Sequence, residues 1–159
     1  KIFPPLKDRL TTVDFEPYTA EELAEIIKLC APDVVFPDGC VDEIATTVRN
    51  NARSAVKRAQ EITLYCGAKE SMIFTLQDFA DLSDSVGILP CGITYTEKQI
   101  LEVLRNCGSA TLTGLAAKLG LSKTALQRDH ELYLLNKNFM EIDGKRKITT
   151  DGLKLCEAL

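Results

Sequence analysis

The chain has 159 residues, of which 45% are hydrophobic and 26% are charged, which are the proportions of an ordinary globular protein. This length suits one domain or two small ones. No stretch approaches the roughly 18 apolar residues of a membrane span, and the opening KIFPPLKDRL carries charges where a secretory signal needs an apolar run. We therefore expect a cytoplasmic protein without a membrane partner.

The cysteines indicate no metal site. Six are present, none in a Cys-x-x-Cys pair, and the only histidine is His130. A structural zinc site needs four clustered ligands, so the cysteines are predicted to be small buried hydrophobes in a reducing compartment, and His130 to be structural.

Charge is unevenly distributed along the chain. Residues 94–159 carry 10 Lys and Arg against 8 Asp and Glu, whereas the remainder carries 9 against 15. The C-terminal part, at a net +2, is the better candidate to contact a polyanion, although this is far from the charge of a strongly basic DNA-binding domain.

The first half predicts a small helical bundle. Residues 1–18 contain three prolines and the alternating stretch LTTVDFEPY, which indicates a loop and a short strand without a core of its own. Thr19 and Glu22 form a capping-box pattern that opens a helix ending before Pro32. Further helices are expected near residues 41–48, at 52–66 with Gly67 just beyond its end, and after Thr75. Gly and Pro in VGILPCGIT then predict a linker.

The second half predicts a winged helix-turn-helix. Thr96 with Gln99 is expected to cap one helix, Thr111 the next and Ser122 a third, with a turn at Gly120-Leu121-Ser122 between the last two. Candidate core positions of the third helix are Leu126, Leu132, Tyr133 and Leu135. An Asp143-Gly144 step between alternating stretches predicts a hairpin wing, and spaced leucines near the end suggest a closing helix. The expected fold class is mainly α: a small four-helix bundle followed by a winged helix-turn-helix with a β-hairpin.

The order of these elements resembles the RuvB family of Holliday-junction branch-migration ATPases, within the AAA+ group. The resemblance rests on PLKDRLTTVDFEPYTAEELAEII, VDEIATTVRNNARSAVKRAQE and HELYLLNKNFMEIDGKRKITTDG, in that order. It implies that residues 1–18 are the tail end of an ATPase core, residues 19–90 a helical lid and residues 91–159 a winged DNA-binding domain.

Several residues depart from the family pattern. Asn50-Asn51-Ala52-Arg53 replaces a Gly-Thr-Pro-Arg motif and keeps only its arginine, and Leu10 stands where phenylalanine is usual. The step from Arg9 to Tyr18 is one residue shorter, and Glu141 or Ile142 replaces an arginine that flanks the wing. These departures indicate a divergent relative.

The resemblance gives three residues a nucleotide-related role. It makes Arg9 an arginine finger that reaches the ATP of a neighbouring subunit, where a guanidinium neutralises the transferring phosphoryl group. It makes Arg53 a sensor of the γ-phosphate in its own subunit, with Arg49 as the outside candidate, and it places Tyr18 by the adenine. The alternatives are an ordinary surface pair for Arg9, a solvated helix residue for Arg53 and a core tyrosine for Tyr18.

Five cations are candidates for DNA contact. Lys145, Arg146 and Lys147 are expected at the wing tip, and Lys123 and Arg128 on the recognition helix, all contacting phosphates without sequence preference. The alternative is a solvated basic turn, and Glu131, Glu141 and Asp143 nearby weaken the field.

The leading hypothesis is the C-terminal part of a RuvB-like motor, whose full chain forms a homo-hexamer around double-stranded or branched DNA and uses ATP and Mg²⁺. The resemblance also implies a RuvA-like junction-binding partner, which docks on the missing front half. The 159 residues lack GxxxxGK[ST], so this piece is expected neither to hydrolyse ATP nor to hold it tightly. The alternatives are an AAA+ helicase loader or replication initiator, and a non-enzymatic winged-helix transcription regulator.

Overall fold

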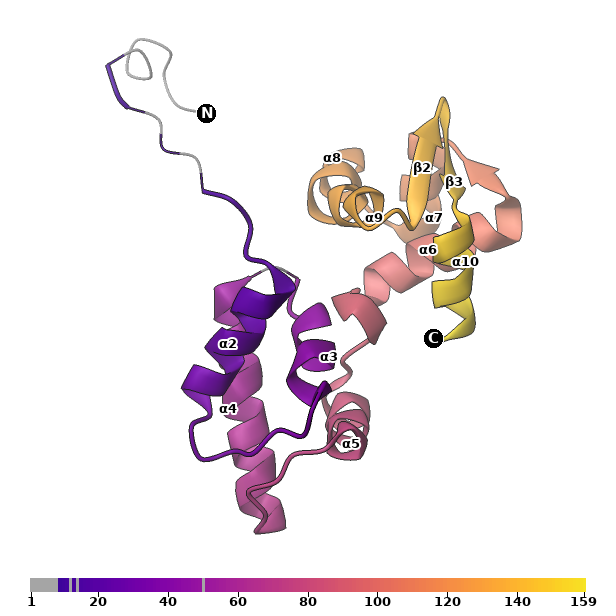
Figure 1. The fold of residues 1–159 in the computed structure, drawn as a ribbon. Coiled ribbons are helices and arrows are strands. Elements are labelled where there is room, and N and C mark those ends of the chain that lie inside the picture. Colours follow the sequence, from indigo (N-terminus) through magenta and orange to yellow (C-terminus); the bar gives the residue numbers. More distant parts are fainter. Residues whose placement is uncertain (1–8, 12, 14, 50) are drawn as a thin grey trace. The chain divides into compact units, whose positions relative to one another are not determined.

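The computed structural model describes residues 9–11, 13, 15–49 and 51–159. The chain divides into two compact units, Lys1–Ile73 and Phe74–Leu159. Both are mainly helical, and the second also carries a small antiparallel sheet, so the predicted fold class is confirmed (Figure 1).

The described part of the first unit contains three helices, α2 (Ala20–Cys30), α3 (Cys40–Thr46) and α4 (Ala52–Lys69), with α2 packed against both of the others. The capping box that opens α2 is present. The Thr19 amide donates to Glu22 Oε2 at 2.8 Å, and the Glu22 amide donates to Thr19 Oγ1 at 3.2 Å. Residues 9–11, 13 and 15–18 precede α2 as exposed backbone without a strand, and the rest of that segment lies outside the described residues.

Helix α4 presents mostly small side chains on its buried face. Ala55, Ala59, Ile62 and Cys66 are each at most 3% exposed and recur every three or four residues, which allows close helix packing. The predicted end at Cys66 is wrong. The helix continues through Gly67 to Lys69 and ends where Glu70 takes a left-handed conformation at φ 52°.

The second unit begins before α5 (Leu76–Val86), which Thr75 and Asp78 open with a capping box. The predicted boundary at residues 90 and 91 thus falls inside this unit and does not coincide with the division at residue 73. The assignment of the segments to ATPase core, lid and DNA-binding domain stays a prediction.

The winged part of the second unit follows a short 3-10 turn, η1 (Pro90–Gly92). In chain order it contains α6 (Tyr95–Cys107), β1 (Ser109–Ala110), α7 (Leu112–Leu119), α8 (Lys123–Ala125), the π-helical stretch η2 (Leu126–Glu131), α9 (Leu132–Asn136), β2 (Met140–Asp143), β3 (Lys145–Ile148) and α10 (Thr150–Glu157).

The cap of α6 differs from the prediction. Thr94 with Glu97, rather than Thr96 with Gln99, forms the capping box, and the Thr94 amide donates to Glu97 Oε2 at 2.7 Å. Thr111 and Ser122 cap their helices as predicted, and Gly120 ends α7 in a left-handed conformation. The helix-turn-helix is therefore present.

The wing is a β2–β3 hairpin turned by Gly144 at φ +65°, as predicted. Strand β3 lies in the centre of the sheet, between β1 and β2, with Arg146 opposite Ala110 on one side and Ile142 on the other. The core beneath the wing and helices is apolar and contains Ile93, Ile100, Leu101, Leu104, Leu115, Ala116, Leu126, Leu134, Phe139, Met140 and Leu155.

The recognition helix runs continuously through α8, η2 and α9 (Figure 1). Its π-helical middle changes which residues face the core. Leu126 and Leu134 are fully buried, whereas Leu132, a predicted core residue, is 58% exposed. Each residue of a π-helix turns through a smaller angle than in an α-helix, so this stretch shifts the phase of the residues that follow.

Within the described part of the chain, no helix is both long and apolar enough to cross a membrane.

Candidate nucleic-acid interface and nucleotide-related residues

Two lysines of the wing reach its surface. Lys145 is exposed and comes directly after the turn glycine, so it lies at the tip of the hairpin. Lys147, two residues further on the same face of β3, is partly exposed, and its Nζ lies 3.0 Å from Asp143 Oδ2. The hydrogen bond to that carboxylate raises the pKa of Lys147. Both lysines are placed where a phosphate backbone can approach.

Arg146 has a different environment. Its side chain points to the opposite face of β3 and is 8% exposed. Arg146 Nε lies 2.7 Å from Glu131 Oε1 and its Nη2 lies 3.1 Å from Oε2, a two-pronged contact with a residue of η2 that is itself 3% exposed. Arg146, expected among the DNA-contacting cations of the wing tip, is therefore buried and paired, which disfavours a DNA contact by its guanidinium.

The recognition helix contributes one cation at its start and one in its middle. Lys123 is exposed in the first turn, behind the Ser122 cap, whose Oγ accepts the Ala125 amide at 3.1 Å. Arg128 is also exposed, but its Nε lies 2.7 Å from Asp129 Oδ1. That contact raises the pKa of Arg128 and lowers the pKa of Asp129.

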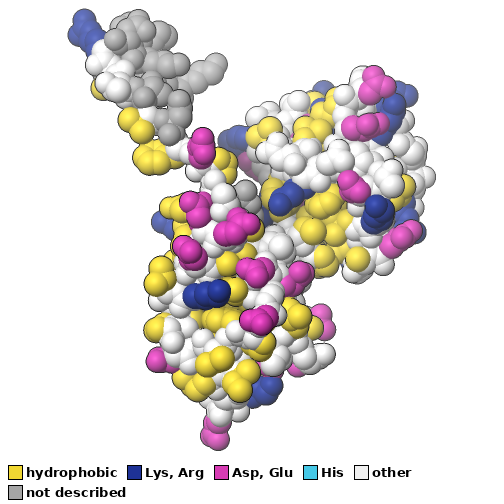
Figure 2. Space-filling view, viewed as in Figure 1, with side chains coloured by type: hydrophobic (Ala, Val, Ile, Leu, Met, Phe, Trp, Pro, Cys, Tyr) yellow, Lys and Arg dark blue, Asp and Glu magenta, His cyan; other side chains and the backbone are white. Residues whose placement is uncertain are grey.

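Cations and carboxylates alternate over the surface of the second unit, without a continuous basic patch on the face seen in Figure 2. Of the five predicted DNA-contacting cations, Arg128, Arg146 and Lys147 have a carboxylate partner. Lys123 and Lys145 form no ion pair within the part of the chain that is described. The arrangement suits a small number of phosphate contacts, which are strongly weakened by salt.

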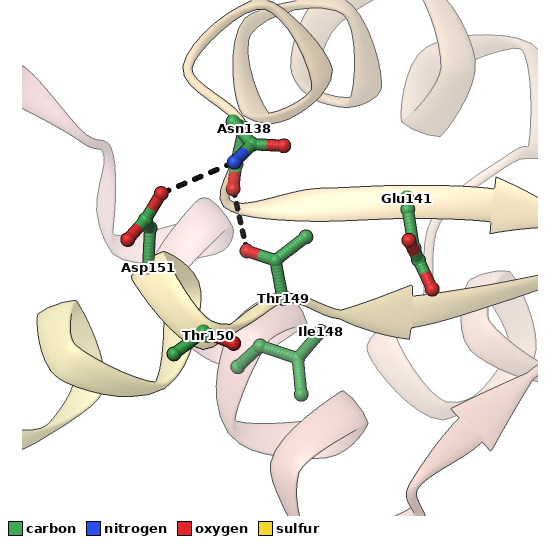
Figure 3. A pocket seen from close by; sticks show the side chains of 6 residues that line it. All are labelled: Asn138, Glu141, Ile148, Thr149, Thr150 and Asp151. Atoms are coloured by element: carbon green, nitrogen blue, oxygen red, sulfur yellow. Dashed lines mark hydrogen bonds between the residues drawn. The ribbon is translucent and has the colours of Figure 1, made fainter.

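An open pocket of about 470 Å³ lies at the base of the wing, beside the start of α10 (Figure 3). It is lined by Asn138, Glu141, Ile148, Thr149, Thr150 and Asp151. Asn138 Nδ2 donates to Asp151 Oδ2 at 3.1 Å, and Thr149 Oγ1 donates to the Asn138 carbonyl oxygen. Two carboxylates in its wall make this pocket a poor site for a phosphate.

Arg53 is the second residue of α4 and is exposed. Its backbone amide donates to Asn51 Oδ1 at 2.9 Å, so Asn51 is the N-cap of this long helix. The positive end of a helix dipole, together with a guanidinium beside it, suits an anionic group such as a phosphate. Asn50, the first of the departures from the family motif, lies outside the described residues.

Arg9 and Tyr18 lie in the exposed segment before α2, with Tyr18 45% exposed next to the Thr19 cap. Tyr18 is thus half-exposed in the described part of the chain, and neither interpretation of its role is tested. No hydrogen bond or ion pair within the described residues joins the side chains of Arg9, Tyr18 and Arg53. Their nucleotide-related roles stay predictions.

Sequence reasoning missed the partnership of Glu131 with Arg146. The only signal was a charged residue directly before the apolar run LYLL, and its partner is 15 residues away along the chain. It also missed Glu97, which is fully buried and has Oε1 3.6 Å from His130 Nδ1. A structural role for His130 fits this placement. The six cysteines are free thiols, and the described residues contain no group of side chains that could hold a metal ion.

No family model matches the chain, but comparisons with known proteins find relatives that share one description. It is 28% identical to the Holliday junction branch migration complex subunit RuvB of Thermotoga maritima, over 92% of this chain and 46% of that protein. It is 25% identical to the same subunit of Nostoc punctiforme, over 92% of this chain and 42% of that protein. The chain thus spans about half the length of the curated relatives it matches.

The solved Holliday junction branch migration motor RuvB of Thermotoga maritima has the same fold. It superposes with a TM-score of 0.82 at 24% identity, over 98% of this chain and 55% of that structure. A second structure, the R170A mutant of the same protein in its own numbering, gives a TM-score of 0.81 over similar shares.

Proposed function

The chain is related to the RuvB family in both sequence and fold, and from this premise we propose that it supplies the lid and the DNA-binding end of an ATP-driven DNA motor. The observation that carries the proposal is the extent of the match: a single relative aligns with 92% of the chain, through both compact units. A stand-alone winged-helix regulator would share only the winged part. The motor would act in Holliday-junction branch migration, and so in DNA recombination and repair.

In this proposal the wing and the recognition helix hold the DNA backbone. Of the five candidate cations, Lys145 and Lys123 are exposed and form no ion pair among the described residues, so they are the strongest phosphate ligands of the five. A motor that moves along DNA needs contacts that are independent of sequence, and phosphate contacts have that property. The substrate class is double-stranded or branched DNA.

The first unit would act on the nucleotide. Arg53, at the N-terminus of α4, would sense the γ-phosphate in its own subunit, and Tyr18 would lie by the adenine. Arg9 would reach the ATP of the neighbouring subunit in a homo-hexameric ring and stabilise the charge on the phosphoryl group in transit. The exposure of all three side chains in this structure supports their availability for such contacts.

ATP and Mg²⁺ would be held chiefly by a nucleotide-binding core that carries a phosphate loop, because the 159 residues contain no GxxxxGK[ST]. A RuvA-like junction-binding protein would dock on that core. We expect the 159-residue chain alone to show no ATPase activity.

The DNA part is tested by binding of the 159-residue chain to a four-way junction, a plain duplex and duplexes of random sequence. We expect weak, salt-sensitive binding without a preferred sequence. A single preferred operator sequence would refute the motor and favour the regulator.

The role of Arg9 is tested by subunit mixing in the polypeptide that joins this chain to a nucleotide-binding core. Arg9→Ala should reduce ATP hydrolysis by about 10³-fold or more while nucleotide still binds. Mixing Arg9→Ala subunits with subunits that lack the phosphate-loop lysine should recover part of the activity, because some interfaces then combine both intact groups. Absence of recovery would show that Arg9 does not act across the subunit interface.

A further inference from the structure

We propose that Glu131 and Arg146 are positioning residues, which hold the wing at a fixed angle to the recognition helix so that Lys145 and Lys123 contact the same DNA. This inference rests on the proposed function. It assigns the wing arginine to the inside of the domain and leaves the phosphate contacts to the two lysines.

The sheet register directs the Arg146 side chain toward the helix. Side chains alternate along a strand, so Arg146 points to the face of β3 opposite Lys145 and Lys147. Its cross-strand neighbours on that face are Ala110 and Ile142. Because β3 is the central strand, the Arg146 side chain extends from the middle of the sheet. A movement of the hairpin would therefore displace the guanidinium from Glu131.

The contact itself is directional. Two parallel N–H···O bonds, at 2.7 and 3.1 Å, fix both the distance and the mutual orientation of the two groups. A single-point contact by lysine would not fix the orientation. Arg146 and Glu131 are 8% and 3% exposed, and separation of such a pair leaves an uncompensated buried charge. The guanidinium is therefore held in place and is not released to a phosphate.

The helix side of the pair is fastened to the body of the domain. His130, the residue before Glu131, is partly buried against α6, with Nδ1 3.6 Å from Glu97 Oε1, which is beyond hydrogen-bond distance. Tyr133 donates its hydroxyl hydrogen to the Cys91 carbonyl oxygen. Residues 130–133 thus link η2 and α9 to the body of the domain on one side and, through Glu131, to the wing on the other. The wing takes its angle from this anchored stretch.

Replacement of Glu131 separates this proposal from a direct DNA contact by Arg146. Glu131→Gln removes a negative charge and frees the guanidinium. If Arg146 contacted phosphate, the variant would bind DNA as well as the parent or more tightly. If the pair positions the wing, Glu131→Gln and Arg146→Lys both weaken binding to a four-way junction, by about tenfold at ~50 mM salt.

Binding of the 159-residue chain to the junction is measured by fluorescence anisotropy at several salt concentrations, with melting followed to confirm that each variant is folded. Glu157→Gln, which removes an exposed carboxylate from the end of α10, is the matched charge control and should bind slightly tighter or unchanged. The charge swap Glu131→Arg with Arg146→Glu should recover most of the lost affinity. If the swap does not fold, the apolar pair Glu131→Met with Arg146→Met serves instead, because such replacements are often neutral for stability. This apolar variant should bind as weakly as the single variants.

The effect of Lys145→Ala on the salt dependence of DNA binding provides a second readout. A purely stabilising role of the Glu131–Arg146 pair would leave this effect unchanged. In the parent, Lys145→Ala should lower the slope of log affinity against log salt by about one. In the Glu131→Gln variant the same substitution should change this slope little, because the wing is already out of position. Unchanged or tighter binding by Glu131→Gln, with Lys145→Ala still effective, would overturn the positioning role alone. A parent chain that does not bind DNA would overturn the proposed function and this inference with it.

Discussion

Gly152, in the first turn of α10, has no room for an added methyl group. The residue is buried, and its amide donates to Thr149 Oγ1 at 3.1 Å. A Cβ built on Gly152 would lie 2.1 Å from the Phe139 carbonyl oxygen and 2.8 Å from Ile148 Cγ1. The oxygen cannot turn aside like a flexible side chain, because it belongs to the backbone and accepts the Thr149 amide at 3.2 Å.

The expected cost follows from overpacking. Adding a methyl group to a packed site costs about 1–3 kcal/mol, and a clash with backbone belongs at the upper end. Alanine recovers about 1 kcal/mol through its better helix propensity. The net free energy of unfolding should therefore fall by about 2 kcal/mol in Gly152→Ala, which corresponds to a melting temperature lower by about 8–16 °C for a unit of this size.

Thermal unfolding followed by circular dichroism measures this difference. Gly67→Ala is the matched control, since Gly67 lies within α4 and nothing is within 4 Å of its built Cβ. The same substitution there should stabilise the protein by up to about 1 kcal/mol. A Gly152→Ala variant that melts at or above the temperature of the parent would refute the reasoning.

Three further predictions concern the helix cap, the DNA contacts and the thiols. Asn51→Ala removes the acceptor of the Arg53 amide and should lower the free energy of unfolding by about 1 kcal/mol in urea titrations, whereas Asn51→Asp should preserve it. Lys145→Ala should reduce the slope of log affinity against log salt by about one. The control is Lys154, an exposed cation on α10 that is paired with Asp151, and Lys154→Ala should leave the slope unchanged. Equal slopes for the two variants would contradict this. Exposed Cys30 should react with a thiol reagent well before half-buried Cys156, whose pKa is raised by burial, and comparable rates of labelling would argue against that environment.

Much of the secondary structure was predictable because it depends on contacts within a few residues. The capping pattern at Thr19 and Glu22 predicts the start of α2, and the Asp143-Gly144 step predicts the turn of the wing. Where two candidate caps lie close together, local pattern was insufficient. Thr94 and Thr96 are each followed, three residues later, by a residue that can complete a capping box. Thr94 is the N-cap because its partner Glu97 is buried in the domain while it accepts the Thr94 amide.

The candidate site was predictable only in part. Lys145 and Lys123 were expected at the wing and on the recognition helix, and the structure leaves both exposed there. Arg146 has the same charge as Lys145 and follows it directly, so composition and position do not distinguish them. The nucleotide-related roles of Arg9, Tyr18 and Arg53 came from resemblance, and no contact among the described residues tests them.

The sequence by itself determined where most helices begin, where the hairpin turns and which family the chain resembles, because caps, turn residues and apolar spacing act over short stretches. Only the tertiary structure decided that the π-helical stretch η2 turns Leu134 inward in place of Leu132, and that Arg146 pairs with Glu131 instead of facing solvent. Both outcomes depend on how the recognition helix packs against the sheet and the core. Burial then decides whether a charged side chain must find a partner inside the protein.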